Sequence, residues 1–124
     1  MSTTEQPRVN SLPSLTTLAE IVQQCHDDSI RWFPECHEVI HHTLGLTGEA
    51  GEFANKVKKL HRGTDDIHDA RTRYELVMEL ADVLIYTANI AALLKVDLAK
   101  AYAQKRMINE RRFGNSGEAE QASD

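Results

Sequence analysis

Residues 76–94, LVMELADVLIYTANIAALL, are the feature that most restricts what this chain can fold into. The stretch is long and apolar enough to raise the possibility of a membrane span. It carries Glu79 and Asp82 near its middle, however, and ionised carboxylates are costly in the centre of a bilayer. We therefore predict a largely buried helix in a soluble helical bundle, with no membrane partner.

The rest of the chain has the same helical character. Apolar residues recur at helical spacing in four segments, which are separated by proline, glycine or polar runs, and no segment alternates as a strand would. Thr17 and Glu20 are spaced like a capping box, and Asp97 is placed to cap the last helix. The predicted fold is all-α and four-helix-bundle-like, with helices from about Ser14 to before Pro34, from Glu35 to Leu60, from Arg71 to Leu94 and from Asp97 to Gly114.

The length and composition indicate one modest domain. The chain has 124 residues with 41% hydrophobic content, so its core would gain from burying further surface against another subunit. We expect a homo-oligomer, either a dimer or a tetramer. The predicted domain spans residues 14–114, whereas the compositions of residues 1–13 and 115–124 cannot offset chain entropy and predict disorder.

Charge and cysteine content restrict the partners and the compartment. The formal net charge is −5, with 19 acidic and 14 basic residues, so the chain lacks the electrostatic footprint of a protein that binds nucleic-acid polymers. Cys25 and Cys36 are too few for a disulfide framework, and the first residues lack the apolar core of a signal peptide. These features favour the cytoplasm.

Two acidic pairs are the main candidates for a site. Glu49 and Glu52 stand three residues apart on the second helix, and Glu79 and Asp82 repeat this step on the third, so each pair shares a helical face. Tyr86 continues the second face. Antiparallel packing would let the pairs meet. Unpaired, the four carboxylates would raise one another's pKa values, whereas a hard divalent cation favours their ionised form. We predict bound Mg²⁺, with Mn²⁺ as a substitute.

Glycine recurs inside the second predicted helix. Gly45, Gly48 and Gly51 are spaced three apart, and each costs roughly 1 kcal/mol relative to alanine in a helix. This spacing would make sense if another backbone or a substrate approached closely, and a plain loop over residues 44–51 is the alternative. The segment is not a P-loop, because it lacks the G-K-[ST] ending that cradles phosphates.

Taken in order, these segments resemble the MazG-like all-α nucleoside-triphosphate pyrophosphohydrolases, which include dCTP pyrophosphatases. The family signature is E-x-x-E followed on a later helix by E-x-x-D, and it closes with K-x-x-x-N-x-x-R. The resemblance covers roughly residues 30–113. It is carried by GEAGE with Glu49 and Glu52, ELADVLIY with Glu79, Asp82 and Tyr86, KVDL at 95–98, and KRMINERRF with Lys105, Asn109 and Arg112.

The resemblance implies an activity and a set of roles. Magnesium would be held by the four acids, water would attack the α phosphorus, and nucleoside monophosphate and pyrophosphate would leave, as in enzymes that cleanse nucleotide pools. Glu49 or Glu52, or a metal-bound hydroxide, would take the proton of the water. The triphosphate and nucleoside would be bound by Lys105, Asn109, Arg112 and Tyr86.

Two further residues have weaker claims on the substrate. Trp32 could stack on a base, although packing in the core would explain it equally well. Lys56 lies on the face of the first acidic pair, where an ordinary i, i+4 salt bridge is the simpler explanation.

Other classes of protein remain open at this point. HEVIH at 37–41 matches the H-E-x-x-H pattern of zinc metalloproteases if His37 and His41 share a helical face. Glu38 and His41 also fit one E-x-x-H element of a di-iron bundle, but the second copy that such bundles need is missing. A non-catalytic helical module that binds nucleotides is a further alternative.

Overall fold

The computed structural model describes residues 17–63 and 66–114, and these are helical throughout apart from short connections. Within this part of the chain there is no strand, so the predicted all-α fold is confirmed. The segments predicted to be disordered, 1–13 and 115–124, lie outside the described residues. The elements are α1 (Leu18–Trp32), α2 (Val39–His61), α3 (Ala70–Leu94), α4 (Leu98–Asn109) and a π-helical turn, η2 (Glu110–Gly114).

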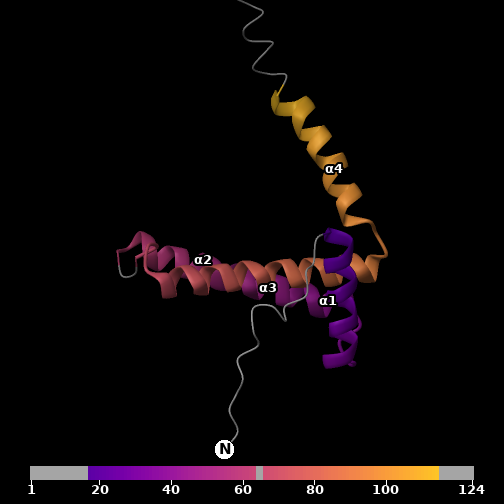
Figure 1. The fold of residues 1–124 in the computed structure, drawn as a ribbon, viewed down its shortest axis with the longest axis horizontal. Coiled ribbons are helices and arrows are strands. Elements are labelled where there is room, and N and C mark those ends of the chain that lie inside the picture. Colours follow the sequence, from indigo (N-terminus) through magenta and orange to yellow (C-terminus); the bar gives the residue numbers. More distant parts are fainter. Residues whose placement is uncertain (1–16, 64–65, 115–124) are drawn as a thin grey trace, which may run out of the picture.

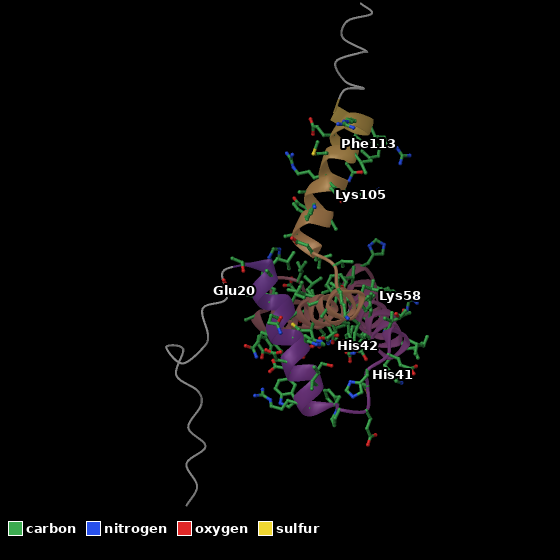
Figure 2. The ribbon with its side chains drawn as sticks, turned by 90° about the vertical axis from the view of Figure 1, so that its right-hand side faces the viewer. Glu20, His41, His42, Lys58, Lys105 and Phe113 are labelled. Carbon is green, nitrogen blue, oxygen red and sulfur yellow. The ribbon has the colours of Figure 1, made fainter. Side chains whose placement is uncertain are left out.

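The α2 and α3 helices form an antiparallel pair, and the other two helices are arranged around one end of it. In Figure 1, α2 and α3 lie side by side along the horizontal axis, while α1 crosses the pair near the C-terminal end of α3. The α4 helix leaves the same end and extends away from the pair (Figures 1 and 2). Its contacts within the chain are made mainly with α1 and η2.

Side-chain caps fix where three of the helices begin. The backbone N–H of Glu20 donates to Thr17 Oγ1 (3.1 Å), and that of Lys100 donates to Asp97 Oδ1 (3.0 Å). Asp69 caps α3 in the same way. The caps predicted at Thr17 and Asp97 are therefore confirmed. Because Thr17 itself has an extended backbone, α1 begins at Leu18 rather than near Ser14.

The second helix begins later than the sequence predicted, at Val39 instead of Glu35. A turn closes first, in which the backbone N–H of Cys36 donates to the carbonyl oxygen of Phe33 (2.9 Å). The Cys36 carbonyl oxygen then lies 3.2 Å from Nε2 of the buried His42, so it is paired with a side chain and not with the helix.

The late start of α2 also bears on the zinc-protease and di-iron alternatives. His37 and Glu38 precede α2, so His37 and His41 do not share a helical face. The arrangement that the zinc-protease pattern requires is not formed. The E-x-x-H element of a di-iron site loses its helical spacing for the same reason, because Glu38 lies outside the helix.

The core of the described part of the chain is small. Its buried apolar side chains are Leu76, Ala88 and Ala91, all on α3, and two of the three are alanines. Packing of this extent buries little apolar surface for a chain of this length, and so the hydrophobic contribution to folding is modest.

One face of α3 is left uncovered. Val77, Leu80 and Leu84 are 53%, 51% and 41% exposed, so the prediction that this helix is largely buried is wrong for this face of the single chain. They lie about 170° around the helix from the acidic face at 100° per residue. The α3 helix is also long and apolar enough to cross a membrane by length and composition. A single helix of this kind is weak evidence for a membrane span. Its acids face α2 instead.

Candidate metal centre

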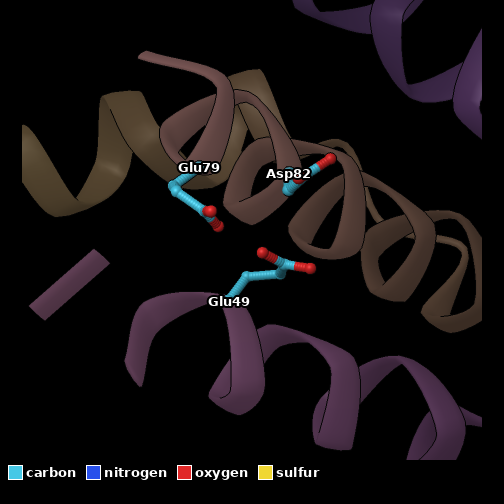
Figure 3. Close-up of side chains that lie close together, drawn as sticks. All are labelled: Glu49, Glu79 and Asp82. Atoms are coloured by element: carbon cyan, nitrogen blue, oxygen red, sulfur yellow. The ribbon is translucent and has the colours of Figure 1, made fainter. Parts of the chain in front are cut away.

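Three of the four predicted acids converge between α2 and α3. Glu49 comes from α2 and Glu79 and Asp82 from α3, and one carboxylate oxygen of each lies within 4.8 Å of the other two (Figure 3). The three residue spacing on α3 places its two acids on one face, and the antiparallel packing brings Glu49 opposite them. Oxygen atoms at this separation can share one ion.

The fourth acid borders this cluster without joining it. Glu52 follows Glu49 by three residues on α2 and is exposed, and it is not part of the group of oxygens within 4.8 Å. It is near enough to act electrostatically, because its charge helps to raise the pKa of Glu49. Glu52 is therefore the acid with the freest access to solvent.

The cluster is strained electrostatically in the absence of a cation. A hydrogen bond with Glu79, followed by burial and by repulsion from Glu52, Asp82 and Glu79, raises the pKa of Glu49 from 4.5 to about 7. The pKa of Glu79 is lowered, mainly by a hydrogen bond from Lys56 and then by the one with Glu49. At neutral pH Glu49 is thus about half protonated, and the two carboxyl groups share that proton.

Two oxygens in the cluster have no protein partner. When both carboxyl groups are ionised, neither can donate to the other, and Glu49 Oε2 and Glu79 Oε2 are then buried without a hydrogen-bond partner. Buried oxygens in this condition are unfavourable unless a ligand satisfies them, and carboxylate oxygens are the ligands that Mg²⁺ and similar hard cations prefer. The donor set therefore fits a divalent cation.

Lys56 contacts this cluster across the helix pair. Its Nζ lies 2.9 Å from Glu79 Oε1, so it pairs with the opposite helix, whereas the sequence suggested a salt bridge along α2. The Lys56 side chain is 34% exposed and that of Glu79 only 12%. A cation thus stands at the rim of the acidic cluster with its ammonium group against a largely buried carboxylate.

Tyr86 lies one turn beyond Asp82 and packs on the glycine-rich part of α2. A Cβ atom on Gly45 would overlap the Tyr86 ring, while the ring of buried His42 lies 6.2 Å from that of Tyr86, centroid to centroid, at 50°. The predicted close approach thus occurs at Gly45 alone and is made by a side chain. A Cβ atom on Gly48 or Gly51 would meet nothing within 4 Å beyond its chain neighbours and the backbone of its own helix.

These glycines supply a matched pair of substitutions. Gly45→Ala should destabilise the fold by about 1–3 kcal/mol, because the new methyl group displaces the Tyr86 ring. Gly48→Ala should stabilise it by up to about 1 kcal/mol, because alanine favours the helix and no atom opposes it there. Urea unfolding of both variants measures the difference, and equal effects would contradict this packing.

Asn89 is a buried polar residue on the acidic face of α3, and the sequence did not show that it is buried. It lies on the same arc of α3 as Glu79, Asp82 and Tyr86, and it is only 5% exposed. Its Oδ1 is buried without a hydrogen-bond partner. Its place on that arc was visible in the helical spacing, but its burial follows from the packing of the other helices.

The predicted phosphate-binding residues are not brought to the acids within one chain. Lys105 and Asn109 lie on α4 and Arg112 on η2, and all three are exposed. Figure 2 shows Lys105 on the part of α4 that extends away from the α2–α3 pair. The Arg112 guanidinium stacks on Phe113, 5.0 Å from the ring centroid.

Trp32 ends α1 and is 60% exposed, so it does not pack in the core of the single chain. The guanidinium of Arg31 lies 5.2 Å from its ring centroid. Of the two interpretations from sequence, core packing within the single chain is therefore wrong.

Comparison with known proteins bears on this arrangement. The profile of the MazG nucleotide pyrophosphohydrolase domain matches residues 35–111, which is more than half of the chain. The chain belongs to the MazG family. The matched region of this MazG domain contains α2, α3 and α4 with all four acids, whereas Trp32 and Arg112 lie outside it. The resemblance seen in the motifs is thereby confirmed.

Two curated relatives share parts of this MazG chain. The Gene 37 protein of Mycobacterium phage L5 is 49% identical over 57 residues, which are 46% of this chain and 50% of that protein. Human dCTP pyrophosphatase 1 (Homo sapiens) is 36% identical over 85 residues, which are 67% of this chain and 50% of that protein. The chain thus spans about half the length of the curated relatives it matches.

Proposed function

We propose that this MazG chain is a Mg²⁺-dependent nucleoside triphosphate pyrophosphohydrolase, which converts a nucleoside triphosphate and water into the monophosphate and pyrophosphate. The observation that carries the proposal is the convergence of Glu49, Glu79 and Asp82 with unpartnered buried oxygens. Family membership and the likeness to a dCTP pyrophosphatase support it. A role in nucleotide-pool cleansing in the cytoplasm would suit this activity.

The acids have different parts in this proposal. Glu49, Glu79 and Asp82 would hold Mg²⁺, with Mn²⁺ as a substitute. Glu52 would be the fourth acid at the metal, on the exposed edge of the cluster, and the one least engaged with the ion. The cation would neutralise charge on the phosphate oxygens. Between the two residues considered from sequence, we assign the removal of the water proton to Glu52, because its carboxylate is exposed and lies outside the group of three.

The nucleotide would need groups that a single chain does not gather. Lys105, Asn109 and Arg112 project on α4 and η2, away from the acids. The face of α3 formed by Val77, Leu80 and Leu84 is exposed, and apolar surface of this kind favours association. We infer a homo-oligomer in which the α4 and η2 of a second copy supply these three residues to the phosphates, with Tyr86 and Trp32 near the nucleoside.

Pyrophosphate release from a panel of ribo- and deoxynucleoside triphosphates with Mg²⁺ tests this function. In H₂¹⁸O, the label should enter the monophosphate and not the pyrophosphate, because water attacks the α phosphorus. Thermal protection by nucleotides without pyrophosphate release would instead favour the non-catalytic binding module. Labelled pyrophosphate would contradict the proposed site of attack.

Metal binding should depend on pH because of Glu49. Because its pKa is raised, protonated Glu49 adds to the free energy of unfolding of the metal-free protein. This contribution is fully present below about pH 4.5 and is lost as the pH rises through about 7. Binding of Mg²⁺ requires the ionised carboxylate, so Mg²⁺ affinity should rise through about pH 7 and then level off. Calorimetry at pH 6 in buffers of different ionisation enthalpy should detect close to one proton released per Mg²⁺ bound. No release at that pH would contradict the shared proton.

A further inference from the structure

Lys56 occupies a position that metal binding alone does not explain. Its Nζ donates to Glu79 Oε1 at 2.9 Å, while Oε2 of the same carboxylate is buried and has no partner when Glu49 is also ionised. Glu79 is thus paired with a cation on one oxygen and open to the acidic cluster with the other. The ammonium group comes from α2, the helix that also supplies Glu49.

We propose that Lys56 is a built-in counter-cation, which neutralises Glu79 in the metal-free protein, yields to a divalent cation, and then contacts the phosphates of the substrate. The inference rests on the proposed function, since it needs a metal at Glu49, Glu79 and Asp82. It assigns to Lys56 a place that the metal takes over at Glu79, whereas the sequence suggested an ordinary salt bridge for this residue.

Charge is the first argument for this exchange. A divalent cation held by Glu79 would share one carboxylate with the Lys56 ammonium group, and two cations on one carboxylate repel each other. Before the metal binds, Lys56 is favourable there, because its ammonium group pairs at 2.9 Å with the largely buried carboxylate of Glu79 in a group of three acids. Lys56 therefore stabilises the metal-free state more than the metal-bound state.

The second argument is that Lys56 is free to move. Its side chain is 34% exposed, and a lysine ammonium is a strongly hydrated charge on a flexible stem, so it can leave Glu79 without being buried alone. A nucleoside triphosphate brings several negative charges to the same rim. The displaced ammonium would then find phosphate oxygens within reach of its stem.

Metal affinity tests the first half of the proposal without any measurement of turnover. We expect Lys56→Gln to bind Mg²⁺ about fivefold more tightly than the natural chain by calorimetry, and to melt at lower temperature in EDTA. Lys56→Arg should restore both values, because it keeps the charge. Lys58→Gln, an equal charge change on an exposed residue of α2, should alter neither.

Phosphate affinity tests the second half. With saturating Mg²⁺, inorganic tripolyphosphate should bind at least about tenfold more weakly to Lys56→Gln than to the natural chain or to Lys58→Gln. Unchanged tripolyphosphate affinity would overturn the contact with phosphate.

The failures of the two proposals can be told apart. If the natural chain binds no Mg²⁺, the proposed function fails with the metal site. If the natural chain binds Mg²⁺ but Lys56→Gln binds it equally or more weakly, the site stands, and Lys56 is an orienting partner of Glu79, not a counter-cation that the metal displaces.

Discussion

Asp82→Asn and Glu49→Gln should each lower pyrophosphate release by at least about a hundredfold while the helical circular dichroism spectrum stays unchanged. Each substitution removes an ionised oxygen donor from a group whose members lie within 4.8 Å of one another. The amide that replaces it cannot supply the negative charge that a hard cation needs. Steady-state kinetics with Mg²⁺ measures the loss.

A stability measurement separates this loss from misfolding. Without metal, Asp82→Asn should raise the melting temperature in EDTA, because it removes a like charge from beside Glu49. Asp27→Asn provides the control: Asp27 is an exposed carboxylate on α1 that accepts a hydrogen bond from Gln23 Nε2 (2.9 Å), and its loss should leave turnover near the natural value. Near-normal turnover by Asp82→Asn would remove Asp82 from the site.

Mixing two inactive chains should restore activity if the second subunit completes the site. One chain carries Asp82→Asn and the other carries Lys105→Ala with Arg112→Ala. In a mixed dimer, one site collects both defects and the other collects none. Random refolding makes half of the dimers mixed, so turnover should recover to about a quarter of the natural value.

The alternative arrangement gives the opposite result. If α4 served the acids of its own chain, each site in the mixed dimer would carry one defect, and mixing would restore nothing. Native mass spectrometry confirms that the chains have exchanged. Exchange without recovery would therefore contradict sites shared between subunits, while the metal centre itself would remain to be judged by the single substitutions.

The helices and the acidic cluster were predictable because they depend on local periodicity. Thr17 and Asp97 are caps that act within one turn of their own helix. The step of three residues in each acidic pair fixes a shared face, and a short connection makes the two helices antiparallel. Gly45 signalled a close approach, although the spacing could not show that Tyr86 makes it.

The remaining features depend on contacts between elements. The start of α2 moved to Val39 because the Cys36 carbonyl oxygen is paired with the side chain of His42. Lys56 pairs with Glu79 on α3, 23 residues away in the sequence, and helical spacing within α2 cannot predict this contact. The direction of α4 is set where Lys95 takes a left-handed conformation (φ 55°), which periodicity does not predict for lysine.

Anomalous diffraction from crystals soaked in Mn²⁺ tests the central claim most directly. We expect a peak between α2 and α3, with oxygens of Glu49, Glu79 and Asp82 about 2.1 Å from it. The peak should be absent from Asp82→Asn crystals. A map without a peak there, or with its peak beside His37 and His41, would contradict a metal centre built from the facing acids of these two helices.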